Sequence, residues 1–445
     1  MLFANQRKWI YEQKVTGPWQ RARKGTFALL HLILFATPWL VIKGNPALLI
    51  DLPARRLHLF GAIFTASDTI FLLFLLLFLA FSLFFFTSLF GRLWCGFACP
   101  QTVFLDTWIR PFEEWIEGDW VRRRKRDQAG WSLDRFWRKA VKWSAYLAIS
   151  IVISMSFASY FAGARALWSG QASALEYTIV GIFTAVWFLD LAWFREQFCN
   201  YLCPYARFQS ALTDAETLMV QYEIPRGEPR GGADAAEAGR CIECNKCVVV
   251  CPQGIDIRNG FQLECIACAR CIDACDIVMG KLGHETLITW SSMAESQGKQ
   301  PRRLRPRTVL YGGILTGIAA TVAVLMLGRA PFDATVQRAP GSLFIIDADG
   351  FVRNTYLVRV TSKDPAPAPV AFRIRVEGLP AEDVTVQDFS LHTTQSATIP
   401  LIIRMKASAD LPRTIPIAVH VSSPSHDVEL DATFKTEGKI GTNSN

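Results

Sequence analysis

Charged residues are scarce in this chain of 445 residues. Asp, Glu, Lys and Arg make up 19% of the sequence, whereas hydrophobic residues make up 51% and include 31 Phe and 14 Trp. Soluble domains usually contain about 25% charged residues, so the composition argues against a purely soluble enzyme. This much apolar surface also excludes intrinsic disorder as the main state. At roughly 150 residues per domain, the length predicts two to four structural units.

Cysteine is absent after Cys275, although the chain contains 12 cysteines. All of them fall in four tight clusters upstream of that point. The disulfides of a secreted domain would be scattered, so this clustering indicates ligand spacing. The sequence also lacks a GxGxxG motif, a Walker phosphate loop and a Ser–His–Asp constellation. The cysteines are therefore the main candidates for chemistry.

Five apolar stretches predict transmembrane helices, because crossing a bilayer takes roughly 20 helical residues. They cover residues 26–43, 69–90, 141–162, 176–194 and 308–327. The second is the clearest because it contains no charge, and the first is the weakest because Pro38 interrupts it. No small-residue cleavage site follows the first stretch, which predicts an anchor and not a signal peptide.

Lys and Arg are distributed unevenly over the loops between these stretches. Residues 1–25 contain six and residues 91–140 contain ten, whereas residues 44–68 contain two and residues 163–175 contain one. Because Lys and Arg concentrate in cytoplasmic loops, we expect a cytoplasmic N-terminus and a cytoplasmic segment over 195–306. Residues 330–445 are then periplasmic. Topology explains the net charge of +8, so the expected partner is the lipid bilayer and not nucleic acid.

Residues 330–445 alternate between apolar and polar side chains with a period of two. Val370, Phe372, Ile374 and Val376 point one way, and the pattern recurs over 415–421 and 428–434. Short alternating strands separated by Gly, Pro and Asp predict an antiparallel β-sandwich. No Cys–Trp–Cys core is present, so the domain is expected to be Ig-like in architecture only.

Eight cysteines form two runs with the spacing C-x2-C-x2-C-x3-C. The first run is Cys241, Cys244, Cys247 and Cys251, and the second is Cys265, Cys268, Cys271 and Cys275. In bacterial two-cluster ferredoxins with this spacing, the fourth cysteine of each run ligates the other cluster. One cluster would then use Cys275 with the first three cysteines of the first run. The other would use Cys251 with the first three cysteines of the second run. Zinc also suits C-x2-C pairs, but two complete runs favour two 4Fe–4S clusters that relay single electrons.

Four further cysteines lie where the predicted spans end. Cys95 and Cys99, followed by Pro100, come after the second span, and Cys199 and Cys203, followed by Pro204, come after the fourth. The neighbouring aromatic residues also repeat 104 positions later, which indicates an internal duplication. Cysteines four apart share one face of a helix, and the proline disfavours helical geometry at the second cysteine.

Several interpretations of these four cysteines remain open. They can be buried free thiols, the ligands of a further iron–sulfur cluster, a redox dithiol site, or a copper site, since thiolates favour cuprous copper. His31, in the cytoplasmic third of the first predicted span, is a further ligand candidate because ionisable residues at membrane depth are often functional.

The order of these motifs resembles the CcoG family of cytochrome oxidase accessory proteins, also called FixG or RdxA. The similarity rests on Cys95-Gly-Phe-Ala-Cys99-Pro, Cys199-Asn-Tyr-Leu-Cys203-Pro, the two ferredoxin runs and the outward β-domain. Asp276 departs from the proline expected after the second run.

The resemblance implies a helical membrane protein of the bacterial cytoplasmic membrane with a dicluster ferredoxin insert and a C-terminal Ig-like sandwich. It implies reduction of cupric to cuprous copper during assembly of a cbb-type oxidase. The catalytic and copper-binding residues would be Cys95, Cys99, Cys199 and Cys203. Its partners would be that oxidase or its copper-delivery proteins, and an unidentified cytoplasmic electron donor. The alternatives are a quinone-linked polyferredoxin relay to a periplasmic reductase, and a non-enzymatic scaffold for oxidase assembly.

Overall fold

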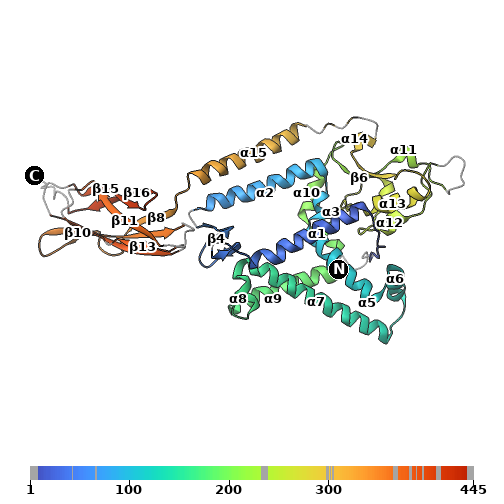
Figure 1. Cartoon of the computed structure of the whole chain (residues 1–445), viewed down its shortest axis with the longest axis horizontal. Coiled ribbons are helices and arrows are strands. Elements are labelled where there is room, and N and C mark those ends of the chain that lie inside the picture. Colours follow the sequence, from blue (N-terminus) through green and yellow to red (C-terminus); the bar gives the residue numbers. More distant parts are fainter. Residues whose placement is uncertain are drawn as a thin grey trace, which may run out of the picture. The chain divides into compact units, whose positions relative to one another are not determined.

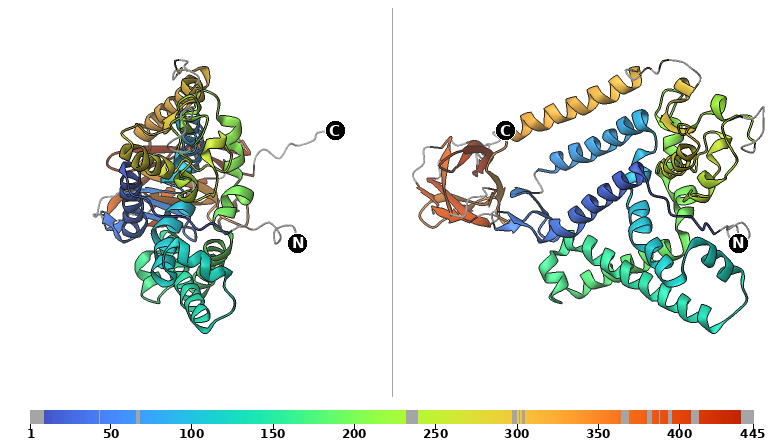
Figure 2. Two further views of the ribbon diagram at one scale, coloured as in Figure 1. Left: turned by 90° about the vertical axis from the view of Figure 1, so that its right-hand side faces the viewer. Right: turned by 45° about the vertical axis from the view of Figure 1, so that its right-hand side comes forward.

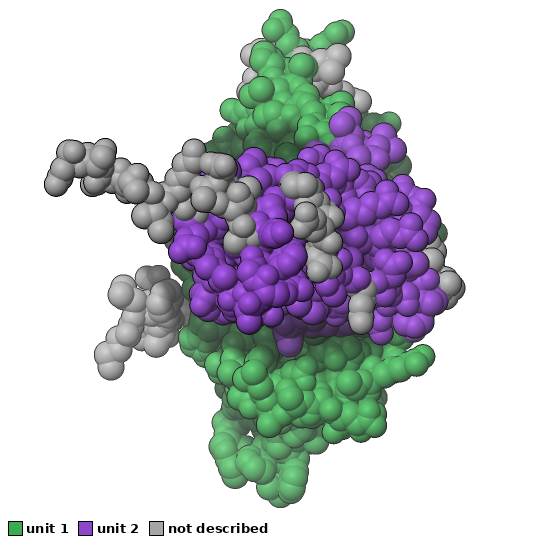
Figure 3. Space-filling model, turned by 90° about the vertical axis from the view of Figure 1, so that its left-hand side faces the viewer, with its two compact units in different colours: residues 1–39, 72–321 green, residues 40–71, 322–445 purple. Residues whose placement is uncertain are grey.

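The computed structural model describes most of the chain. The described residues are 9–42, 44–65, 68–231, 239–296, 300, 302, 305–363, 369–379, 383–386, 388–392, 395–406 and 412–437. They form two compact units, one of residues 1–39 and 72–321 and the other of residues 40–71 and 322–445, coloured separately in Figure 3.

Four helices in the described part of the chain are long and apolar enough to cross a membrane. They are α2 (Thr69–Phe90), α7 (Leu133–Ala162), α9 (Ala174–Leu189, continued by a π-helical turn to Phe194) and α15 (Pro306–Leu327). These helices match four of the five predicted stretches. Helices α7 and α9 lie side by side (Figure 2), and Phe84 of α2 meets Tyr311 of α15. The side chains of α2 are largely exposed, as expected of a helix that faces lipid.

The bounds predicted for the first stretch, 26–43, were wrong. Helix α1 runs from Pro18 to Ala36, begins with three basic residues in its first two turns, and is not among the four candidate spans. Pro18 suits the first turn of a helix, because its missing N–H would have no partner there. A 3-10 turn containing Pro38 then ends the helix before strand β1 (Val41–Ile42). Lys43, the predicted end, lies outside the described residues.

Short strands follow α1 and belong to the same unit as the C-terminal domain. They are β2 (Asn45–Pro46), β3 (Leu48–Asp51), β4 (Arg56–Leu59) and β5 (Ala62–Phe64), with β3, β4 and β5 forming one antiparallel sheet. Asp68 lies between this sheet and α2. Its carboxylate pairs with Arg329 at 2.7 Å and Lys363 at 3.0 Å, which ties the segment to the C-terminal domain.

The C-terminal domain is the predicted sandwich of two antiparallel sheets. One sheet has the order β12-β14-β10-β8 with β9 beside β10, and the other has the order β13-β11-β15-β16. The strands are β8 (Phe332–Arg338), β9 (Ile345–Ile346), β10 (Phe351–Ser362), β11 (Val370–Glu377), β12 (Asp383–Thr385), β13 (Phe389–Leu391), β14 (Ser396–Lys406), β15 (Thr414–Ser422) and β16 (Asp427–Lys435). Phe372 and Ile374 are buried while Arg373 and Arg375 are exposed, so the predicted alternation is confirmed.

The remaining elements are short helices and one two-stranded sheet (Figure 1). They are α3 (Leu93–Phe97), α4 (Pro100–Phe104), α5 (Arg110–Glu117), α6 (Trp120–Gln128), α8 (Ala164–Trp168), α10 (Pro204–Leu212), β6 (Met219–Tyr222), α11 (Ile224–Gly227), α12 (Lys246–Val249), α13 (Arg270–Lys281), β7 (Ile288–Ser291) and α14 (Met293–Ser296). A π-helical turn, Leu105–Ile109, joins α4 to α5. Strands β6 and β7 and helices α12 and α13 enclose a small apolar core around Val220 and Ile272.

Candidate iron–sulfur and thiol sites

The eight ferredoxin-type cysteines line two cavities. The first, about 400 Å³ including its open mouth, is lined by Cys241, Cys244, Cys247 and Cys275. The second, about 360 Å³, is lined by Cys251, Cys265, Cys268 and Cys271, and Cys247 borders it too. The structure therefore gathers the cysteines in the two sets that the spacing predicts, with the fourth cysteine of each run beside the other run. Their role as cluster ligands stays a prediction.

Both cysteine loops wrap around their cavities with the same unusual backbone. Glu243 and Asn245 flank Cys244 with positive φ angles, and Ala267 and Ala269, 24 positions later, flank Cys268 in the same way. A left-handed residue other than glycine costs roughly 1–2 kcal/mol, and such strain persists mainly where a structure is built around a function. The repeated strain supports loops shaped to surround a bound group.

The two runs differ after their fourth cysteine. Pro252 follows Cys251, and helix α12 has already ended at Val249. Asp276 replaces the expected proline in the second run, and helix α13 continues through it to Lys281. Proline removes a backbone donor and clashes with the preceding turn, so Asp276 is what allows this helix to extend.

The chemistry of the cavity walls fits an iron–sulfur cluster. The walls are mainly apolar apart from the sulfurs, and burial raises the pKa of Cys247 and Cys251 to about 12 and that of Cys265 to about 11. A bound metal ion has the opposite effect and lowers the pKa of these thiols, because a coordinating thiol is deprotonated outright. The sites therefore favour binding of a positively charged metal group over free thiolates.

The two membrane-edge motifs share one local geometry. Cys99 has extended backbone (φ −63°, ψ 126°) before α4, and Cys203 has nearly the same conformation (φ −71°, ψ 111°) before α10. The proline after each cysteine begins the helix, as predicted from the restriction that proline places on the residue before it. The first cysteines differ, since Cys95 lies in α3 and Cys199 in a π-helical turn, Phe198–Leu202.

These four thiols lie near enough to influence one another's pKa. Burial, together with the neighbouring thiols Cys99 and Cys203, raises the pKa of Cys95 to about 12. Burial likewise raises the pKa of Cys199, with further contributions from the other three thiols. In the part of the chain that the structure describes, no group of three or more His, Cys, Asp or Glu side chains is arranged to hold a single metal ion.

The first membrane-edge motif, Cys95–Cys99, directly contacts the second ferredoxin loop, which is the stretch from Cys265 to Cys271. A Cβ atom added to Gly96 would lie 2.7 Å from the carbonyl oxygens of both Ile266 and Ala267. Arg23 donates to the Gly96 carbonyl at 2.9 Å, and Gln20 donates to the Cys268 carbonyl at 3.2 Å. Helix α1 thus bridges the two loops, and glycine permits their close approach.

His31 does not join the cysteines. Its Nε2 accepts a hydrogen bond from the Trp108 indole N–H at 2.6 Å, and its Nδ1 lies 2.7 Å from the Phe27 carbonyl. This pair of contacts corresponds to a neutral ring with the proton on Nδ1. Both ring nitrogens are therefore engaged, which argues against His31 as a metal ligand.

A buried ionic network, which sequence reasoning missed, joins the thiol motifs to the ferredoxin segment. Asp106 pairs with Arg23 at 2.6 Å and Arg270 at 3.1 Å, and it also pairs with Arg110. Arg110 reaches Glu196, next to the second motif, at 2.8 Å. The spacing of Asp106 and Arg110 on one helix could have revealed that single pair, but the other partners are distant in sequence.

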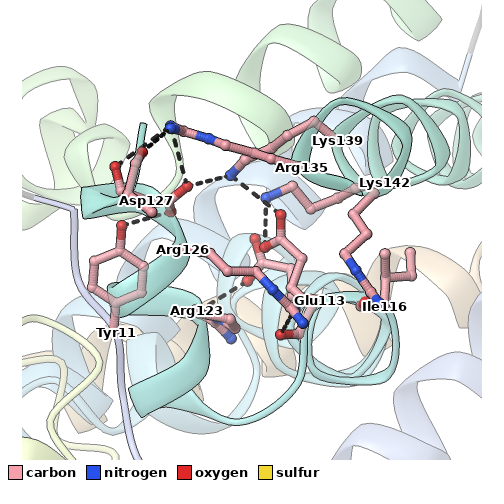
Figure 4. A network of polar contacts seen from close by, with 12 residues as sticks. Tyr11, Glu113, Ile116, Arg123, Arg126, Asp127, Arg135, Lys139 and Lys142 are labelled. Atoms are coloured by element: carbon pink, nitrogen blue, oxygen red, sulfur yellow. Dashed lines mark hydrogen bonds and ion pairs between the residues drawn. The ribbon is translucent and has the colours of Figure 1, made fainter. Parts of the chain in front are cut away.

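A second network surrounds Glu113 on α5 (Figure 4). Arg195 donates two hydrogen bonds to its carboxylate, at 2.8 and 3.0 Å, and Arg123 lies 3.4 Å away. Burial alone would raise the pKa of Glu113, but the two arginines outweigh it and hold the pKa well below its usual value. Glu113 is therefore ionised, and it fixes the position of Arg195 four residues before Cys199.

Three protein-family models match separate parts of the chain. Residues 71–126 match the family described as a 4Fe-4S binding domain, residues 194–293 match the 4Fe-4S dicluster domain, and residues 322–437 match the IG-like fold at the C-terminal of FixG, putative oxidoreductase. A FixG-related protein from Vibrio parahaemolyticus, solved as a crystal structure, aligns with 24% of this chain and 99% of its own, at 19% identity and a TM-score of 0.22.

Two curated relatives match most of the chain. Protein RdxA of Cereibacter sphaeroides is 37% identical over 388 residues, which is 83% of this chain and 82% of the relative. Nitrogen fixation protein FixG of Rhizobium meliloti is 34% identical over 433 residues, 86% of this chain and 82% of the relative. With its candidate membrane helices and dicluster domain, the chain is a membrane iron–sulfur electron-transfer protein, and it belongs to the FixG/RdxA family.

Proposed function

We propose that this protein reduces cupric to cuprous copper, with electrons relayed through two 4Fe–4S clusters, during assembly of a cbb-type haem–copper oxidase. The observation that carries the proposal is that four thiols from two duplicated motifs influence one another's pKa, and that the first of these motifs contacts a ferredoxin loop at Gly96. When bound, the clusters supply single-electron transfer. One electron converts one cupric ion to one cuprous ion.

The chain's own residues have distinct parts in this proposal. Cys241, Cys244, Cys247 and Cys275 would hold one cluster, and Cys251, Cys265, Cys268 and Cys271 the other. Cys95, Cys99, Cys199 and Cys203 would bind the copper substrate, and their soft sulfurs favour the cuprous product. Gly96 sets the close approach between the second ferredoxin loop and the copper site.

We also propose five membrane crossings, with the ferredoxin segment in the cytoplasm and the β-domain in the periplasm. Asp273 of α13 caps the first turn of α1 at the backbone N–H of Gln20, so α1 starts beside the ferredoxin segment. Residues 40–71, which follow α1, form one unit with residues 322–445. Helix α2 starts from that unit and ends where the Leu89 carbonyl accepts from the Leu218 N–H. Helix α1 has 19 residues, about 28 Å of helix, which supports a crossing with its basic first turns at the interface.

A third iron–sulfur cluster on the four membrane-edge cysteines is the second candidate. The match of residues 71–126 to a 4Fe-4S binding domain favours it, because that range contains Cys95 and Cys99. The protein would then be a longer electron relay, and copper would not bind at these thiols.

Paired substitutions separate the two candidates. We expect Cys95→Ser with Cys99→Ser, and Cys199→Ser with Cys203→Ser, each to abolish copper binding and reduce cupric reduction at least tenfold, because hydroxyls are poor ligands for cuprous copper. Both variants should keep the iron of two clusters, about eight atoms per chain, and stay reducible by dithionite. The measurements are metal content and the rate of cuprous formation, trapped by a chelator, with His31→Ala as the control of smaller effect.

Parent protein with about twelve iron atoms per chain would favour the third cluster. Unchanged copper reduction in both paired variants would overturn the copper assignment.

A further inference from the structure

A large cavity lies beside both the end of the first ferredoxin cysteine run, at Cys251, and the second thiol motif. Its volume is about 2350 Å³, including the mouth open to solvent. Segments far apart in sequence form its wall: the N-terminal segment, α5, α6, the first turns of α7, the second thiol motif and the residues after Cys251. Small-molecule sites typically have about 300–1,000 Å³, so the cavity can contain a ligand of cofactor size.

The cavity wall carries more positive than negative charge. Six cationic side chains line it: Arg123, Arg124, Arg135, Lys139, Lys142 and Arg195. Three carboxylates, those of Glu113, Glu117 and Asp127, line it as well, which leaves an excess of three positive charges.

Each carboxylate is shared between cations (Figure 4). Glu117 pairs with Lys139 at 3.2 Å and Lys142 at 2.8 Å, and Asp127 pairs with Lys139 at 2.7 Å. Among the described residues, Arg124 has no ion-pair partner. The local excess of cations therefore favours an anionic ligand.

Two buried polar atoms at the wall have no hydrogen-bond partner among the described residues. They are Oε1 of Gln253 and Nε of Arg195, and their side chains belong to residues only 8% and 5% exposed. Buried polar groups in folded proteins are nearly always paired. Both residues line the cavity, and these two atoms lie buried within its wall.

Aromatic side chains and one ferredoxin cysteine also line the cavity. Trp9, Tyr11, Trp120 and Trp143 line the cavity, and such rings stack on planar ligands. Cys251 belongs to this cavity and also to the second cysteine-lined cavity, while Tyr201 lies inside the second thiol motif. A ligand here stands beside a predicted cluster ligand and the predicted copper site.

We propose that this cavity binds a phosphorylated flavin of the flavin mononucleotide class and is the point where electrons enter the protein. The planar ring suits the aromatic wall, and the phosphate suits the excess of cations. A bound reduced flavin becomes oxidised as two electrons pass singly to the iron–sulfur clusters and two protons go to water at the open mouth. The inference rests on the proposed electron relay, since it names the donor class for the same clusters.

Flavin binding can be measured apart from copper chemistry. Flavin mononucleotide is titrated anaerobically with full-length protein in detergent. Binding should quench the fluorescence of the flavin. We expect riboflavin, which lacks the phosphate, to bind at least tenfold more weakly. Arg124→Gln combined with Lys139→Gln should weaken binding of the mononucleotide at least tenfold. Arg122→Gln is the matched control, because Arg122 lies on the same helix, is exposed and does not line the cavity.

Absence of quenching, or equal binding to the double variant and the control, would overturn the flavin site. Displacement of the flavin by phosphatidylglycerol vesicles would also overturn it and assign the cations to a lipid headgroup. Dithionite reduces clusters without flavin but also reduces cupric ion directly. Protein reduced with dithionite, freed of the excess and then mixed with cupric salt therefore tests the proposed function by itself. The two proposals can therefore fail separately.

Discussion

At the scale of single residues, Gly96 has the most constrained position in the thiol motifs. Its neighbours on the ferredoxin side are backbone atoms of Ile266 and Ala267, which cannot move aside as a flexible side chain would. The equivalent position in the second motif is Asn200, which lines the large cavity instead. The duplicated motifs therefore have different neighbours, one against the ferredoxin loop and the other against the proposed donor site.

Gly96→Ala is expected to separate the first motif from the second ferredoxin loop. The added methyl group would meet backbone oxygens at 2.7 Å, so copper reduction should slow at least tenfold while iron content stays at the parent value. Gly280→Ala, in helix α13, is the matched control, because a Cβ there meets nothing within 4 Å. An unchanged rate in Gly96→Ala would refute the assignment of this contact to electron transfer.

Cys244→Ser and Cys268→Ser address the two clusters separately. Each should lower the iron content from about eight to about four atoms per chain, because one 4Fe–4S cluster is lost. The membrane helices should keep their helical content, since they make little contact with these cysteines. The checks are iron and sulfide analysis and circular dichroism. Zinc in stoichiometric amount without a brown chromophore would contradict the iron–sulfur assignment.

At the scale of elements, buried ion pairs hold together segments that are far apart in the sequence. Asp106 and Arg110 connect the helix after the first motif to α1 and α13. Asp68 performs the same task in the other unit, where it joins the strands of residues 40–71 to the β-domain through Arg329 and Lys363. Removing one partner of a buried pair leaves a charge without compensation, which is strongly destabilising.

Asp68→Asn should therefore destabilise the β-domain by about 3–5 kcal/mol. Burial alone would raise the pKa of Asp68, but hydrogen bonds from Arg329, Thr65 and Lys363 outweigh it and hold the pKa below its usual value. Because the folded pKa is the lower one, the stabilisation is present above the unfolded pKa and is lost as pH falls through the folded pKa.

Thermal unfolding followed by limited proteolysis of the β-domain, at pH 7 and at pH 3, measures both effects. Asp431→Asn on β16 is the control, because this carboxylate is exposed. Equal unfolding temperatures for Asp68→Asn and the parent protein at pH 7 would show that the ion pairs of Asp68 with Arg329 and Lys363 do not stabilise the domain.

At the scale of the whole molecule, the proposed topology places donor and acceptor chemistry on one side of the membrane. Both thiol motifs, both ferredoxin runs and the large cavity belong to the unit of residues 1–39 and 72–321. The β-domain carries no cysteine. Copper reduction is therefore proposed for the cytoplasm, and the β-domain is available for a periplasmic partner.

Reporter fusions test this topology. Fusions after Arg165 and at the C-terminus should report the periplasm, and a fusion after Gly231 should report the cytoplasm. The physical basis is the concentration of Lys and Arg in cytoplasmic loops. A reporter at the N-terminus, ahead of α1, distinguishes five crossings from four, since with a periplasmic C-terminus it should report the cytoplasm only if α1 crosses. A cytoplasmic C-terminus would contradict the proposed arrangement.

Local features of this protein could be read from the sequence alone. Runs of about 20 apolar residues, a period of two in strands and cysteine spacing all depend on neighbours in the chain. The matching helices α2, α7, α9 and α15, the sandwich and the extended backbone before Pro100 and Pro204 were therefore predictable.

Packing between distant segments was decided only by the tertiary structure. The bounds of α1 were missed because its basic first turns are stabilised by Asp273, more than 200 residues away, and not by lipid. The contact at Gly96, the pairing of Glu113 with Arg195 and the cavity beside Cys251 likewise join positions that no local pattern connects. Burial makes these charged and close contacts specific, because an unpaired partner is costly away from water, and burial is a property of the folded chain.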